Sequence, residues 1–158
     1  MRTLVVITAL LGALVLAVSA FAVIPRARAS FTGVNKSEKP INGFRPNVTF
    51  NVTANGRTLT KFEFETLGCF GIGRFPAGVD PYSESQWRVA KVPVGKLGNF
   101  NAVVRPVLLL PDGTKMVARI KGTFAKPDQT AGTITYTMSI NGSACGPRTI
   151  KFNARVAS

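Results

Sequence analysis

Few side chains in this chain of 158 residues could do catalytic chemistry. The chain contains no histidine, which excludes Ser-His-Asp and Cys-His catalysis and every metal site that needs an imidazole ligand. Its seven carboxylates are spread along the sequence: Glu38, Glu63, Glu65, Asp80, Glu84, Asp112 and Asp128. We therefore expect a protein that is not an enzyme and that holds no cofactor and no metal.

Glu63 and Glu65 form a carboxylate pair whose spacing could serve catalysis. On a strand they would share one face at about 6–7 Å, a separation that a glycosidase could use. Lys61 has the same parity and would stand beside them. Nothing nearby in the sequence indicates a groove or a raised pKa, so we interpret the pair as part of a solvated outer face.

The most unusual cluster of side chains is basic, and its members are Arg105, Lys115, Arg119 and Lys121. The predicted pairing of two neighbouring strands puts Arg105 directly opposite Arg119 on the outer face. Like charges across a ladder are unfavourable, which suggests that the chain keeps them for binding. We therefore interpret the cluster as a candidate anion-binding site. The alternative is a solvated surface whose long side chains cover apolar neighbours with their stems.

The elements that must position these residues are strands. Short alternating segments are punctuated by Asn-Gly, Asp-Gly and Gly-Pro, and no 3.6-residue period follows the leader. Strands are expected around Asn47–Thr53, Lys61–Glu65, Trp87–Val92, Ala102–Leu110, Met116–Phe124, Thr133–Ile140 and Thr149–Val156. Their apolar faces need a facing layer, so we predict an all-β fold, a single antiparallel β-sandwich of about seven strands.

Turn chemistry sets the expected register of two hairpins. Three-residue loops that end at Gly56 and Gly113 bring the apolar faces together, with Val48 opposite Phe62 in the first hairpin. Both glycines then need a positive φ. Pro106 lacks a backbone donor, so its strand should lie at a sheet edge or contain a bulge there.

An export signal precedes the strands. A positive start and the apolar run Leu4–Ile24 lead to Ala27-Arg28-Ala29, which offers small residues at the positions that a signal peptidase reads. We predict that residues 1–29 are a secretory signal peptide. A cut after Ala20 or Ala22 is an alternative, as is retention of the leader as a membrane anchor, because this apolar run could span a bilayer.

The remaining chain is expected to be secreted, either extracellular or associated with the cell envelope. Residues 30–43 are polar and are predicted to be a flexible entry segment, and residues 44–158 are predicted to be the sandwich domain. Without residues 1–29 the chain has 17 basic and 7 acidic side chains, a net charge of +10. Such a charge favours anionic partners.

Cys69 and Cys145 are the only cysteines. In an oxidising compartment an even count indicates a disulfide, and two cysteines allow one pairing. We therefore predict one disulfide in the domain, with two separate buried thiols as the alternative. Two thiols without histidine do not complete a zinc shell.

The stretch between Cys69 and Trp87 is rich in glycine and proline. A loop of this length is typically functional or mobile. Phe75, Tyr82 and Trp87 are its candidate contact residues. They could form a platform on which sugars stack, or they could fold back and close one end of the sandwich, and we favour closure.

Three runs of sequence, RTLTKFEFETLGC, VARIKGTFA…AGTITYTM and SACGPRTIKFNARV, resemble a family of small secreted actinobacterial proteins. The likeness spans most of residues 44–157. It implies a disulfide-linked β-sandwich of unassigned activity, and it supplies a fold and a location but no ligand. Sequons begin at Asn35, Asn47, Asn51 and Asn141. In a bacterial protein these would be ordinary polar residues rather than glycan sites.

Three functions are compatible with these features. The first is a non-enzymatic module that binds an anionic surface polymer or a partner protein through the basic face. The second is an enzyme or inhibitor accessory that acts through the Cys69–Trp87 loop, and the third is a purely structural envelope protein. We expect no specific nucleic-acid partner, and a membrane only if the leader is retained. Salt-sensitive binding would favour the first function.

Overall fold

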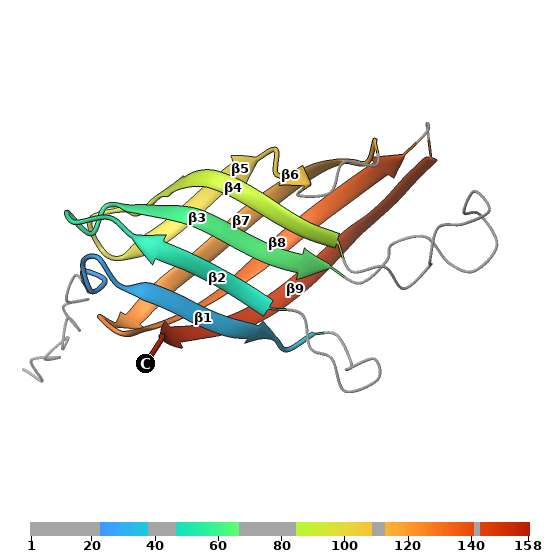
Figure 1. The fold of residues 1–158 in the computed structure, drawn as a ribbon. Coiled ribbons are helices and arrows are strands. Elements are labelled where there is room, and N and C mark those ends of the chain that lie inside the picture. Colours follow the sequence, from blue (N-terminus) through green and yellow to red (C-terminus); the bar gives the residue numbers. More distant parts are fainter. Residues whose placement is uncertain (1–22, 38–46, 67–84, 109–112, 141–142) are drawn as a thin grey trace, which may run out of the picture.

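The computed structural model describes residues 23–37, 47–66, 85–108, 113–140 and 143–158. They form nine strands: β1 (Ser30–Asn35), β2 (Asn47–Val52), β3 (Thr58–Thr66), β4 (Ser85–Pro93), β5 (Asn99–Val104), β6 (Val107–Leu108), β7 (Lys115–Lys126), β8 (Gln129–Ile140) and β9 (Ser143–Val156). All neighbours are antiparallel and belong to one sheet with the order β5-β7-β8-β9-β1-β2-β3-β4-β6. The sheet curls into a half-barrel (Figure 1).

The predicted seven-strand sandwich is wrong, because the nine strands belong to one sheet. β1 joins what would have been two separate sheets, because Phe31 lies opposite Phe50 of β2 and opposite Val156 of β9. Curling buries an apolar face as well as a second sheet does. Of the two cysteines, Cys145 lies within the described residues and is not a free thiol, whereas Cys69 lies outside them. The expected pairing of these two cysteines therefore lies partly outside them.

The flexible entry segment expected at residues 30–43 is wrong for its first part, because residues 30–35 form strand β1. Ser30–Asn35 pairs on both sides, with β2 and with β9, and its Phe31 and Asn35 are buried. Only one large apolar side chain of this strand faces inward, so its own sequence carries a weak strand pattern. Its neighbours supply the pairing that keeps it extended. Residues 38–43 lie outside the described residues.

The two edges of the sheet, β5 and β6, follow each other in the chain. β5 pairs with β7 and β6 pairs with β4, and Arg105 and Pro106 separate them. Val94, which directly follows β4, forms an isolated antiparallel bridge with Phe100 of β5 across the turn between these two strands. The edge or bulge expected at Pro106 is confirmed, since the chain leaves one edge and joins the other at this residue.

The strands form two walls that face each other across the core. β1 to β4 form one wall, here the β1–β4 wall, and β7 to β9 form the other, the β7–β9 wall (Figure 1). In β7, β8 and β9 the apolar residues that alternate with polar ones are buried: Met116, Ala118, Ile120, Phe124, Ile134, Tyr136, Met138, Ile150, Phe152 and Ala154. The alternation therefore predicted correctly which side of each of these strands faces the core.

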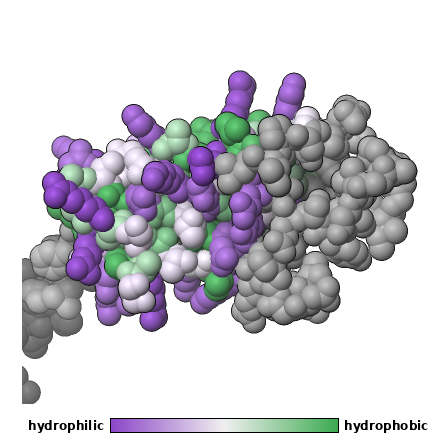
Figure 2. Space-filling model, in the orientation of Figure 1, coloured by the Kyte–Doolittle hydropathy of each residue, from purple (hydrophilic) through white to green (hydrophobic). Residues whose placement is uncertain are grey.

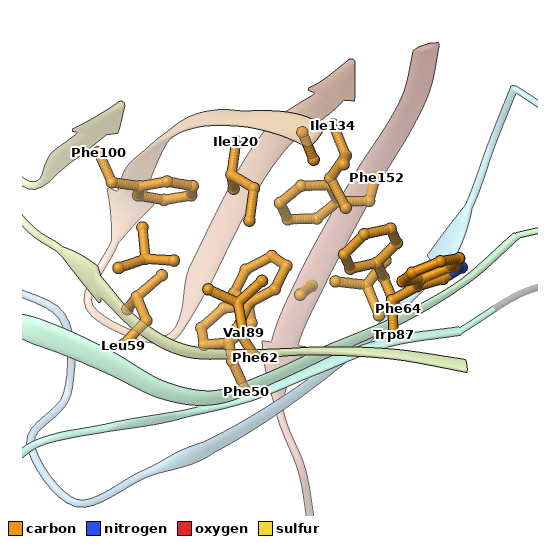
Figure 3. Close-up of a cluster of buried hydrophobic side chains, with 14 of the residues drawn as sticks. Phe50, Leu59, Phe62, Phe64, Trp87, Val89, Phe100, Ile120, Ile134 and Phe152 are labelled. Carbon is orange, nitrogen blue, oxygen red and sulfur yellow. The ribbon is translucent and has the colours of Figure 1, made fainter. Parts of the chain in front are cut away.

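Aromatic rings from both walls meet in the middle of the half-barrel (Figure 3). Phe50 is stacked between Phe31 and Phe62, with ring centroids 5.0 and 5.4 Å away. Phe62 meets Phe152 of the opposite wall edge-to-face at 6.1 Å, and Phe31 meets Phe124 at 5.5 Å. Such pairs add about 0.5–1.5 kcal/mol each beyond the area they bury.

The expected positive φ at the two turn glycines is confirmed, with 68° at Gly56 and 83° at Gly113. The first hairpin is nevertheless longer than predicted. Thr53 N donates to Thr58 O at 3.0 Å, so residues 54–57 form the loop. The side chain of Asn55 organises this loop, because its Oδ1 accepts from Arg57 N at 3.0 Å.

A bulge shifts the register of the same hairpin. Leu59 and Phe62 are both fully buried, and their odd spacing cannot be met by a regular strand. The ladder is irregular between Thr49 and Asn51, and Lys61 adopts a left-handed φ of 47°. Beyond the bulge Val48 lies opposite Phe64. The three-residue loop had predicted Phe62 at this position.

Replacing Phe50 by alanine should lower the free energy of unfolding by about 3–5 kcal/mol, because it removes the central ring of the stack and leaves a cavity. Urea unfolding followed by circular dichroism measures this loss. Val103, which is 61% exposed, is the control, and Val103→Ala should change stability by less than about 0.5 kcal/mol. Similar losses in the two variants would contradict the packing described for Phe50.

Candidate functional site

The outer face of β7 carries the basic side chains that the sequence singled out. Inward and outward positions alternate strictly along the first part of this strand, so Lys115, Arg119 and Lys121 are exposed while Met116, Ala118 and Ile120 between them are buried. Arg119 and Lys121 are two residues apart, about 6.6 Å along the strand. The core therefore fixes the direction in which these cations point.

The expected cross-strand pair of Arg105 and Arg119 is absent. Arg119 lies opposite Val103 of β5 and Thr135 of β8, because the register differs by two residues from the prediction. β5 ends at Val104, and Arg105 is exposed in the link between the two edge strands. Repulsion between these two arginines is therefore no argument for binding, although both project outward as predicted.

The cross-strand neighbours of the other cations are uncharged. Lys121 lies between Asn101 of β5 and Thr133 of β8, and Lys115 lies opposite Ser139. In the described residues no ion pair joins these cations to a carboxylate. Hydroxyl groups therefore separate the positive charges.

β9 extends the basic surface in a way that the sequence did not reveal. Lys151 follows Thr133 in the same row across the sheet, and Arg155 is exposed further along β9. We give the name basic face to five exposed cations of β7 and β9: Lys115, Arg119, Lys121, Lys151 and Arg155. Outward parity was visible in the sequence of β9, but its place beside β8 depends on the sheet order.

The described strands on this side of the molecule carry no carboxylate. β5, β7, β8 and β9 contain no aspartate or glutamate, and Asp128 lies in the turn between β7 and β8 at one end of the face. Within the part of the chain that the structure describes, the acidic residues on strands are Glu63 and Glu65 of β3. In the described strands the carboxylates thus lie on the β1–β4 wall alone, whereas cations lie on both walls.

Three exposed valines accompany the cations near the sheet edges. Val103, Val107 and Val117 are 61%, 68% and 50% exposed. Figure 2 shows long hydrophilic side chains around the visible surface and a hydrophobic area near its upper edge, where β4, β5 and β6 lie. Exposed apolar side chains therefore lie beside the cations at the outer surface of the sheet.

Glu63 and Glu65 are engaged in contacts with their neighbours. Glu63 pairs with Arg88 of β4, with a distance of 2.7 Å from Nη2 to Oε1. Glu65 accepts from Asn47 N at 2.8 Å and from Gln86 Nε2 at 3.2 Å. Both carboxylates therefore link neighbouring strands on the outer surface. This agrees with the interpretation of the pair as part of a solvated outer face.

A shallow depression of about 290 Å³ lies on the outer side of β1, β2 and β3. Thr32, Thr49, Asn51, Lys61 and Glu63 are among its lining residues. The bulge turns Lys61 toward this surface, and Glu63 already has Arg88 as its partner. The charges that line this depression balance each other, and the depression is open to solvent. It is therefore a weaker candidate site than the basic face.

Trp87 is a core residue and not a loop contact. It lies within β4, has no exposed surface, and its indole Nε1 donates to Thr66 Oγ1 at 3.1 Å. The other two predicted loop contacts, Phe75 and Tyr82, lie outside the described residues. The tryptophan therefore supports closure of the core and is unavailable for sugar stacking.

The described residues contain no group of three or more His, Cys, Asp or Glu side chains that could hold a metal ion. In the same part of the chain no helix is long and apolar enough to cross a membrane.

Comparison of the chain with models of protein families, with curated proteins and with solved structures gives no match. The resemblance to small secreted actinobacterial proteins therefore stays an expectation.

The buried position of Trp87 can be tested by fluorescence, since it is the only tryptophan in the chain. Emission should be blue-shifted and insensitive to iodide, because the indole is shielded from solvent. Thr66→Val should cost about 1–3 kcal/mol of stability, because it leaves the buried indole N–H without its acceptor. Strong iodide quenching in the folded protein would show that the indole is accessible and would contradict this placement.

Proposed function

We propose that this protein is a secreted, non-enzymatic β module that binds an anionic envelope polymer through the basic face. The observation that carries the proposal is the concentration of five outward cations on β7 and β9, on a wall whose strands have no carboxylate. A concentrated field attracts polyanions better than the same charge scattered over a domain.

The spacing of the cations favours an extended ligand over a compact one. Arg119 and Lys121 are about 6.6 Å apart along β7, and Lys121 and Lys151 are separated by β8, about 10 Å in all. A single phosphate or carboxylate would engage only the nearest of these side chains and leave the others without a partner. A flexible chain with repeated negative charges can follow them across the sheet.

The groups between the cations suit such a chain. Thr133, Thr135 and Thr149 offer hydroxyls that can donate to or accept from the neutral parts of a polymer, and Thr135 and Thr149 already lie 3.1 Å apart at their Oγ1 atoms. The guanidinium of Arg119 can make bidentate contacts with phosphate or carboxylate. The cations stand on a rigid sheet, so ordering them costs side-chain entropy but no backbone entropy.

Removing Arg119 and Lys121 should weaken binding to long-chain inorganic polyphosphate. Two exposed ionic interactions of about 0.7 kcal/mol each correspond to a decrease of about tenfold in affinity. The dependence of log K on log salt should become shallower by about one for each cation removed. Fluorescence anisotropy with labelled polyphosphate at several salt concentrations measures both for Arg119→Gln/Lys121→Gln.

The control variant is Lys91→Gln/Lys96→Gln, which removes the same charge from β4 and the turn that follows it. Both lysines are exposed. All variants should keep the stability of the parent to within about 0.5 kcal/mol, because the changes are at the surface. Equal decreases of affinity in the two double variants would show that only net charge acts, and would refute a binding site on the basic face.

A further inference from the structure

Residues 23–29 lie inside the predicted signal peptide, yet they are part of the folded domain. Pro25 and Ala29 are buried, with Ala29 at 9% exposure, and Val23 packs against the core. The segment curls over the end of the half-barrel at which the turns β2–β3, β4–β5 and β7–β8 gather (Figure 1). We call residues 23–29 the N-terminal cap.

Backbone hydrogen bonds fix the cap to two different parts of the sheet. Arg26 N donates to Pro127 O in the turn between β7 and β8 at 2.7 Å, and Val52 N at the end of β2 donates to Ala29 O at 2.9 Å. Between these two points Arg28 adopts a left-handed φ of 57°. The cap thus links the two walls at this end of the molecule.

Two turn glycines leave room for the cap. A Cβ on Gly98, in the turn between β4 and β5, would collide with the carbonyl oxygen of Val23. A Cβ on Gly56, in the turn between β2 and β3, would lie 2.8 Å from Cγ2 of Ile24, closer than real Cβ contacts allow. Both turns are therefore shaped to accept a chain that includes Val23 and Ile24.

We propose that signal peptidase cleaves the chain between Ala22 and Val23, so that the cap remains in the mature protein. Water is added across this peptide bond, which leaves a carboxylate on Ala22 and an amine on Val23. Ala20 and Ala22 supply the small side chains that the peptidase reads at the third and first positions before the cut. Cleavage after Ala29, the site that the sequence favoured, would discard every contact described above.

The position of the cut also changes the charge of the mature protein. With Arg26 and Arg28 retained, it has 19 basic and 7 acidic side chains, a net charge of +12. Both arginines are exposed. The cap therefore adds positive charge at one end of the half-barrel as well as covering its core.

N-terminal sequencing of protein exported by a host through its own leader tests the site directly, and the expected first residue is Val23. The proposal rests on the export proposed above, and the outcomes separate the two. Exported protein that begins at Ser30, at Phe21 or at the uncleaved start overturns the cleavage site alone. Protein that stays inside the cell with its leader intact overturns the proposed export as well.

A second measurement tests the role of the cap without the peptidase. Purified chains that begin at Val23 and at Ser30 are compared by thermal unfolding, and the shorter chain should unfold at a temperature lower by about 5 °C or more. Gly98→Ala is then compared with Gly113→Ala. Both glycines have a positive φ, but a Cβ on Gly113 meets nothing within 4 Å.

In the chain that begins at Val23, Gly98→Ala should lower the unfolding temperature more than Gly113→Ala, because only the first clashes with the cap. In the chain that begins at Ser30, Gly98→Ala and Gly113→Ala should lower the unfolding temperature by similar amounts. Equal effects of the two substitutions in the longer chain would overturn the proposed role of the cap, whether or not the shorter chain folds.

Discussion

The inner face of this sheet must be buried against itself, since no helix or second sheet covers it in the part of the chain that the structure describes. Aromatic rings from opposite walls cover this face by packing against each other. Phe62 of β3 contacts Phe152 of β9, and Phe31 of β1 contacts Phe124 of β7. Such contacts require a strong curl. Gly132 permits one close approach, because a Cβ there would lie 2.6 Å from the ring of Phe152. The bulge at Lys61 lets both Leu59 and Phe62 reach the interior.

In the described strands the inward positions hold buried apolar side chains, so the charged side chains lie on the outside. The same alternation that buries Met116, Ala118 and Ile120 presents Lys115, Arg119 and Lys121 to solvent, so the basic face is a direct consequence of the core. The two strand carboxylates lie on the other wall, where Glu63 pairs with Arg88 and Glu65 joins β2 to β4. No carboxylate of the described strands therefore neutralises the cations of β7 and β9. Their positive potential can attract a polyanion, and salt would screen it.

The end of the half-barrel is closed by chain that the sequence pattern had assigned to the leader. Pro25 and Ala29 are small apolar residues that suit either a signal peptide or a buried cap, and their order along the chain does not distinguish these roles. The contact of Val23 with Gly98 does distinguish them, because it joins residues that are far apart in sequence. Under the proposed cleavage after Ala22 this stretch stays with the folded domain, and its retention would add two arginines to the mature protein.

By itself the sequence determined the all-β class, the side of each long strand that faces inward, and the positive φ of Gly56 and Gly113. These features follow from local rules, the alternation of side chains along a strand and the sterics of a turn. Tertiary structure decided the single curled sheet, the place of β1, the burial of Trp87 and the neighbours of Arg119. Each of these depends on which distant strands pair and in which register, and a shift of two residues preserves parity while it replaces every cross-strand partner. The alternation could therefore predict that Arg119 points outward, but not that Val103 and Thr135 flank it.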